Sequence, residues 1–271
     1  MIKIGYLRYF NEEKTILACL ESYKFCDYVF CLTHEPIWGV EMDGSEEIIK
    51  SFIEENGLKD RFFMLKDPNI IFPPYHEYSI NQEVPECNLV SGFCNYGLHF
   101  IKEFIKEKGL NVEEIVVFKI DGDILQLDEG KVFENSTLLE KITPLKSGFS
   151  LIMHENQIFL HESSFGTKGD YFSIPGKYLM DSFYIFTGRY EVLKVPNYND
   201  SNHNLDNSYR FCHFIDYDKI LRRKKSTYDI KNPFILRNFS KNPEIIDVFE
   251  SKVRPFLQLS DSPYKNFRFV Q

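Results

Sequence analysis

The stretch VVFKIDGDIL, residues 116–125, decides the fold expected for this chain. Its β-branched and aromatic residues predict a buried strand, and that strand ends in two carboxylates separated only by a glycine. One aspartate at a strand end is an ordinary turn residue, whereas Asp121 and Asp123 together offer two hard oxygen donors to one divalent cation. Gly122 lets the backbone turn and a ligand approach closely. The plainer alternative is that both acids only cap a turn and face water.

The chain before this stretch alternates strand-like and helix-like segments. Strands are expected at IKIGYLRYF, DYVFCLT and RFFMLKD, and helices at residues 12–24, 45–57 and 88–108. Such a succession predicts an α/β fold, with a mostly parallel Rossmann-type sheet covered by helices. Ligands of these sheets bind beyond the carboxyl ends of the strands, where Asp121 and Asp123 are expected.

The chain after this stretch has a different pattern. One helix is expected at residues 133–142, followed by aromatic strand-like runs such as GFSLIMH, YFSIP and SFYIFTG. These runs predict an α+β lobe that packs on the first half, and NPEIIDVFESKVRPFL predicts a helical tail packed on the surface. The expected organisation is an α/β half (1–125), a second half of the same body (126–240) and a C-terminal tail (241–271).

Composition excludes several classes of protein. The 271 residues are 43% hydrophobic, enough for a substantial core, and the net charge of −8 argues against wrapping nucleic acid. The six cysteines form no C-x-x-C pair and therefore predict buried thiols rather than a zinc or disulfide framework. The first residues lack a basic segment followed by an apolar run, and no stretch approaches the roughly 20 apolar residues of a membrane span. A cytoplasmic protein is expected, and peripheral contact with the inner face of a membrane stays open.

Four segments in order carry a family resemblance. They are Asn11-Glu12-Glu13 after the first strand, YVFCLTHE with the later DGSEEIIKSF, the helix CNYGLHFIKEF, and EIVVFKIDGDI with its Asp-x-Asp. Taken together, the first half resembles the family-two-like glycosyltransferases of the GT-A fold. The insertion PIWGVEM before DGS departs from their pattern, as does the lack of a clear Glu-Asp pair in the second half.

The resemblance implies transfer of a sugar, with inversion, from a UDP- or GDP-linked donor to a hydroxyl of a saccharide or glycolipid. It implies that residues 1–125 form the nucleotide-sugar-binding half and residues 126–240 the acceptor-binding half. The setting it implies is bacterial surface polysaccharide or lipooligosaccharide synthesis. It also implies Mn²⁺ or Mg²⁺ on Asp121 and Asp123, with His213 as a further ligand, although a lone histidine in an aromatic run is more often a core residue. The general base is left among Asp170, Asp206 and Asp181, and loop acids are usually only solvated.

The nucleotide is expected at the carboxyl end of the first strand and the start of the first helix, because parallel sheets gather ligands there. The residues assigned to this pocket are Tyr6, Arg8, Asn11, Glu12, His34, Asn95, Lys119 and Asp121.

Two other functions remain open. A nucleotidyltransferase acting on sugar phosphates would also use paired aspartates, but it usually has a glycine-rich basic loop after the first strand, and YLRYFNEE lacks glycine. A non-catalytic sugar-binding scaffold could keep the same fold. A Rossmann dehydrogenase is excluded because no G-x-G-x-x-G follows a strand.

Overall fold

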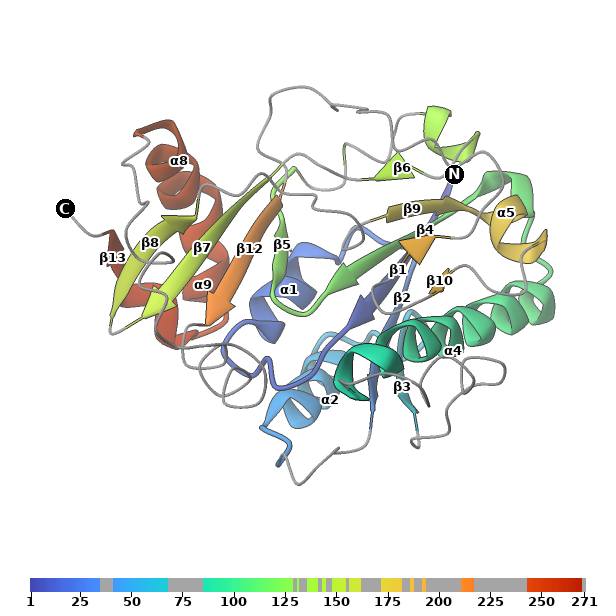
Figure 1. Cartoon of the computed structure of the whole chain (residues 1–271), viewed down its shortest axis with the longest axis horizontal. Coiled ribbons are helices and arrows are strands. Elements are labelled where there is room, and N and C mark those ends of the chain that lie inside the picture. Colours follow the sequence, from blue (N-terminus) through green and yellow to red (C-terminus); the bar gives the residue numbers. More distant parts are fainter. Residues whose placement is uncertain are drawn as a thin grey trace.

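The structure is a computed structural model. It describes residues 1–34, 41–67, 85–128, 131, 136–140, 143–144, 148–154, 156–161, 172–181, 186–187, 192–193, 211–216 and 243–269. These residues form a mixed α/β structure in which two sheets lie next to each other (Figure 1). A separate two-stranded ribbon joins β10 (Phe186–Thr187) to β11 (Val192–Leu193).

Sheet A has six strands in the order β3-β2-β1-β4-β9-β6. Their bounds are β1 Ile2–Arg8, β2 Tyr28–His34, β3 Phe62–Asp67, β4 Ile115–Asp121, β6 Thr143–Pro144 and β9 Phe172–Pro175. The strands β3, β2, β1 and β4 are parallel to one another, while β9 is antiparallel to both β4 and β6. The predicted α/β class with a mostly parallel, Rossmann-like sheet is confirmed.

Helices cover both faces of sheet A. Alternate side chains of β1 point to opposite faces of the sheet, so this strand contacts helices on both sides. Ile4 and Tyr6 pack with α4 (Pro85–Lys108), whereas Leu7 packs with α1 (Ile16–Ser22) and α2 (Ser45–Glu55). The short turn η1 (Val112–Glu114) leads into β4, and α5 (Gly176–Asp181) follows β9. Among the helices that the structure describes, none combines the length and apolar character that crossing a bilayer requires.

The first helix is shorter than the range 12–24 expected from the sequence. Asn11 has a left-handed backbone, with φ of 57°, and the next backbone N–H groups bond across to the start of α2 and the residues just before it. The N–H of Glu12 donates to Ser45 Oγ at 2.8 Å and that of Glu13 to Asp43 Oδ2 at 2.9 Å. Because these bonds hold residues 11–13 in a turn, regular helix begins only at Ile16.

Sheet B has five strands in the order β13-β8-β7-β12-β5. Their bounds are β5 Ile124–Gln126, β7 Gly148–His154, β8 Gln157–His161, β12 Phe211–Asp216 and β13 Arg268–Phe269. The strand β12 lies between β7, to which it is parallel, and β5, to which it is antiparallel. Of the helix expected at 133–142, the structure describes the 3-10 turn η3 (Ser136–Leu139), and the rest of that range apart from Glu140 lies outside the described residues.

The sequence predicted a C-terminal tail packed on the surface. In the structure this segment also contributes side chains to the core. It contains α8 (Pro243–Val248), the π-helical turn η4 (Phe249–Val253), α9 (Arg254–Leu259) and the turn η5 (Pro263–Asn266). Its buried side chains include Phe249, Val253, Leu257 and Tyr264, and β13 adds an edge to sheet B. Ser262 Oγ also donates to the carbonyl of Lys14 at 2.7 Å.

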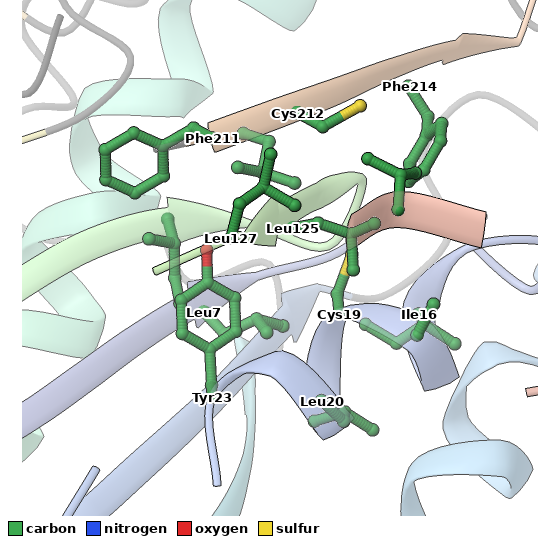
Figure 2. Close-up of a cluster of buried hydrophobic side chains, with 14 of the residues drawn as sticks. Leu7, Ile16, Cys19, Leu20, Tyr23, Leu125, Leu127, Phe211, Cys212 and Phe214 are labelled. Carbon is green, nitrogen blue, oxygen red and sulfur yellow. The ribbon is translucent and has the colours of Figure 1, made fainter. Parts of the chain in front are cut away.

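One hydrophobic cluster joins the two sheets (Figure 2). Side chains of α1 meet those of β5 and β12 in it, with Leu7 of β1 alongside. Cys19 and Cys212 are among its buried thiols, as the apolar sequence around them predicted. Because α1 belongs to this shared core, the position of the loop between β1 and α1 depends on the packing of both sheets.

Candidate functional site

The parallel pairing of β1 with β4 sets Arg8 opposite Asp121 at the carboxyl edge of sheet A. Arg8 Nε lies 2.9 Å from Asp121 Oδ1 and Arg8 Nη2 lies 3.0 Å from Asp121 Oδ2. This is the bidentate geometry in which a planar guanidinium and a carboxylate bind most strongly. About a fifth of each side chain is exposed, so the pair reaches the surface of the edge.

Lys119 places a second positive charge next to Asp121. Its side chain is fully buried, and its Nζ lies 3.7 Å from Asp121 Oδ1. Burial by itself would raise the pKa of Asp121, but the charges of Arg8 and Lys119 and the Arg8 hydrogen bonds outweigh it. The pKa of Asp121 therefore lies below its ordinary value, and the carboxylate stays ionised at neutral pH.

Asp123 has a different neighbour, supplied by sheet B. The pairing of β12 with β5 sets His213 opposite Ile124, and the N–H of Phe214 donates to the carbonyl of Asp123 at 2.8 Å. This brings His213 Nε2 to 3.5 Å from Asp123 Oδ2. On the other side of the ring, Ser150 Oγ lies 3.5 Å from His213 Nδ1.

These contacts allow a test of the expected metal set. A carboxylate and an imidazole 3.5 Å apart fit a Mn²⁺ ion that keeps its other positions for phosphate and water, whereas Mg²⁺ prefers oxygen ligands alone, so Asp123 and His213 suit Mn²⁺. Both oxygens of Asp121 instead face Arg8. Within the described part of the chain, no three or more His, Cys, Asp or Glu side chains are grouped so that they could share a metal ion.

Gly122 fits closely between the two acids and the first helix. A Cβ at this position would lie 2.9 Å from both Ile16 Cδ1 and Tyr9 Cβ. The N–H of Gly122 donates to the carbonyl of Arg8 at 2.7 Å, and Thr15 Oγ1 donates to the carbonyl of Gly122 at 3.1 Å. The conformation of the Asp-Gly-Asp turn is thus set by its contacts with residues before and within α1.

The other residues expected to bind nucleotide occupy different places. Tyr6 is fully buried, and its hydroxyl donates to the carbonyl of Cys94 at 3.1 Å. This hydrogen bond joins β1 to α4 within the core. Asn95, on the same helix, is also buried. The ring of His34 stacks on Phe10, with 4.3 Å between ring centroids. The structure therefore brings together Arg8, Lys119 and Asp121 but not the complete expected set.

An open pocket of about 210 Å³ lies beside the turn. Residues 11–15, residues 41–43, Phe214, Asp216 and Tyr264 line it. It adjoins Asp121–Asp123 because Thr15 bonds to Gly122 and Phe214 bonds to Asp123. Asn11 and Glu12, which were expected to bind nucleotide, lie here.

Asp216 is a candidate that the sequence analysis missed. It ends β12 and lines the pocket, with Oδ2 2.6 Å from Lys14 Nζ. An acidic residue closing the strand-like run FCHFID was the available signal. Of the acids proposed as base, Asp170 and Asp206 lie outside the described residues, and Asp181 is the last residue of α5.

Comparisons with known proteins add little to this geometry. No protein-family model matches the chain, and no curated protein matches it. One solved structure that resembles it is that of 4-diphosphocytidyl-2C-methyl-D-erythritol synthase, with 10% identity and a TM-score of 0.32 over 69% of this chain and 81% of that chain. A likeness at this level identifies no family, so the resemblance to glycosyltransferases stays a prediction.

Proposed function

We propose that this chain transfers a sugar from a nucleotide sugar to a hydroxyl group, with a divalent cation held by Asp123 and His213. The observation that carries the proposal is the meeting of two polar pairs at one sheet edge. Asp123 with His213, and Asp121 with Arg8, adjoin a single turn beyond the carboxyl ends of parallel strands. Phosphate-bearing ligands of α/β sheets bind at such edges.

The donor is proposed to lie over the cationic side of the turn. Arg8 would donate hydrogen bonds to diphosphate oxygens, and the buried charge of Lys119 would favour the same anion. A Mn²⁺ or Mg²⁺ ion, when bound, would neutralise charge that develops on the departing diphosphate. Gly122 keeps the turn packed against Tyr9 and Ile16, where a Cβ would not fit, and so fixes the positions of the two acids on either side of it.

The acceptor is proposed to occupy the open pocket. Five acidic residues, Glu12, Glu13, Glu41, Asp43 and Asp216, line it together with Lys14. Such a wall accepts hydrogen bonds from sugar hydroxyls and repels a phosphorylated acceptor. Asp216, held by Lys14, would accept the proton of the attacking hydroxyl, which places it in the role first assigned to Asp170, Asp206 or Asp181.

Nucleotidyl transfer to a sugar phosphate is the second candidate. It is favoured by the two cationic side chains next to Asp121, which a triphosphate donor also requires. The solved structure named above is a diphosphocytidyl synthase, nearer to this chemistry, but its likeness is too low to weigh in the choice. The acidic pocket, which disfavours a phosphorylated acceptor, and the absence of glycine between Tyr9 and Thr15 count against it.

Identification of the phosphate product separates the two candidates. The purified chain would be incubated with UDP- and GDP-sugars, or with nucleoside triphosphates and sugar phosphates, each with and without Mn²⁺. Sugar transfer, or hydrolysis of the donor, releases a nucleoside diphosphate, whereas nucleotidyl transfer releases pyrophosphate. We expect Mn²⁺-dependent release of nucleoside diphosphate. Pyrophosphate release alone would establish the second candidate, and silence in both panels would favour a non-catalytic scaffold.

A further inference from the structure

The two aspartates of the Asp-Gly-Asp turn have different surroundings. Both oxygens of Asp121 face the guanidinium of Arg8, at 2.9 and 3.0 Å, and Lys119 Nζ lies 3.7 Å from one of them. Asp123 instead faces His213 Nε2 at 3.5 Å. One acid is thus bonded to a fixed positive charge, and the other adjoins an imidazole that can act as a metal ligand.

These surroundings oppose a metal ion at Asp121. A dication there would have to displace a bidentate ion pair and would then lie close to two positive side chains, Arg8 and Lys119. Asp123 Oδ2 and His213 Nε2 lie 3.5 Å apart, so they offer one oxygen and one nitrogen ligand to the same ion. The distances therefore divide the turn into a cation-binding half, at Asp123 and His213, and an anion-binding half, at Arg8 and Lys119.

We infer that Asp121 is a positioning residue for Arg8, which binds a phosphate of the ligand. Asp123 and His213 then form the cation-binding half without Asp121. Asp121 accepts from two of the five N–H donors of the guanidinium, so it fixes the plane of the fork while Arg8 remains about one-fifth exposed at the sheet edge. The inference rests on the proposed function only in taking a diphosphate as the ligand of this edge.

The electrostatic effect of Asp121 and its positioning effect have opposite signs. Removing its negative charge should strengthen the attraction of an anion if charge were all that mattered. Losing the fixed orientation of Arg8 should weaken binding instead, because a charge-assisted bidentate contact depends on geometry. The affinity of Asp121→Asn for an anion therefore distinguishes the two roles: it rises if charge dominates and falls if the positioning of Arg8 dominates.

The experiment measures two affinities in the intact chain: that of Mn²⁺ alone, by electron paramagnetic resonance, and that of pyrophosphate without metal, by calorimetry. We expect Asp123→Asn to weaken Mn²⁺ binding about 30-fold or more and Asp121→Asn to change it less than about threefold. Asp121→Asn should weaken pyrophosphate binding about tenfold. Arg8→Lys, which keeps the charge but not the fork, should match that loss. Glu103→Gln, which breaks a surface ion pair on α4, serves as the control and should change neither affinity.

Asp121→Asn and Arg8→Lys should also be non-additive, since the first acts through the second. Equal loss of Mn²⁺ affinity in both aspartate variants, tighter pyrophosphate binding in Asp121→Asn, or additive losses would each overturn the inference. So would a wild-type chain that binds neither probe. If Asp121→Asn fails to fold, Arg8→Lys decides, and unchanged pyrophosphate affinity in it refutes the assignment. A chain with this binding pattern but no turnover of nucleotide sugars would refute the proposed function alone.

Discussion

Gly122, in the Asp-Gly-Asp turn, has no room for a side chain. We predict that Gly122→Ala destabilises the chain by about 1–3 kcal/mol, because the new Cβ would lie 2.9 Å from atoms of Tyr9 and Ile16. Relief of that contact must shift the turn, so Mn²⁺ affinity should fall as well. Urea unfolding and Mn²⁺ titration of the same variant measure the two effects.

Gly57→Ala is the matched control for this substitution. Gly57 has φ of +63° and nothing within 4 Å of its added Cβ, so alanine there costs backbone strain of about 1 kcal/mol without steric contact. Both variants should lose stability, but Gly57→Ala should keep wild-type Mn²⁺ affinity. Unchanged Mn²⁺ affinity in Gly122→Ala would show that the turn does not hold the cation.

The low pKa of Asp121 makes a second prediction at this scale. Because its folded pKa lies below the unfolded value of about 3.9, its ionised form stabilises the fold at all higher pH, and this contribution is lost as pH falls through the folded pKa. The stability difference between wild type and Asp121→Asn should be largest above about pH 5 and shrink below about pH 4. Urea titrations at several pH values measure it, and a difference independent of pH would contradict the ion pair.

Individual site residues differ in how far the sequence could reveal them. Asp121 and Asp123 follow an apolar run and were predicted from that pattern. Arg8 was predicted at the edge, but its bond to Asp121 depends on the register of β1 with β4, which no local pattern encodes. His213 faces Asp123 only because β12 pairs with β5 across a long stretch of chain. Asp216 was overlooked because a single acid at a strand end resembles an ordinary turn residue.

At the scale of elements, the C-terminal helices offer a direct test of core packing. Leu257 of α9 is fully buried beside α1, whereas Leu259, two residues further, is 72% exposed. We predict that Leu257→Ala costs about 2–5 kcal/mol of unfolding free energy and Leu259→Ala less than about 0.5 kcal/mol. Urea denaturation of both variants measures the contrast, and equal effects would mean that the segment does not belong to the core.

Helical periodicity predicted that these helices exist more reliably than it predicted where they end or what they pack against. The helices at 45–57 and 88–108 were predicted close to the observed α2 and α4, since each has a continuous apolar face. The first helix was predicted too long because Glu12 and Glu13 bond to Ser45 and Asp43, a tertiary contact that local pattern does not contain. The C-terminal helices were assigned to a surface tail because an amphipathic pattern does not specify what its apolar face contacts.

At the scale of the whole molecule, the site forms where two sheets meet. Sheet A supplies Arg8, Lys119 and Asp121, sheet B supplies His213, and Asp123 lies in the turn between β4 and β5. The parallel half could be predicted from the alternation of strands and helices. Sheet B could not, because its order places β12 between β7 and β5, and such non-local pairing leaves no periodic signal in the sequence.

We propose that Asp123 and His213 hold the cation on which sugar transfer depends. The most direct test of this proposal is the Mn²⁺-dependent release of nucleoside diphosphate from a nucleotide sugar by wild type, Asp123→Asn and His213→Gln. Because a catalytic metal contributes several kcal/mol, we predict a loss in kcat/KM of about 100-fold or more in each variant, with a melting temperature close to that of wild type. Wild-type turnover in both folded variants would contradict the claim.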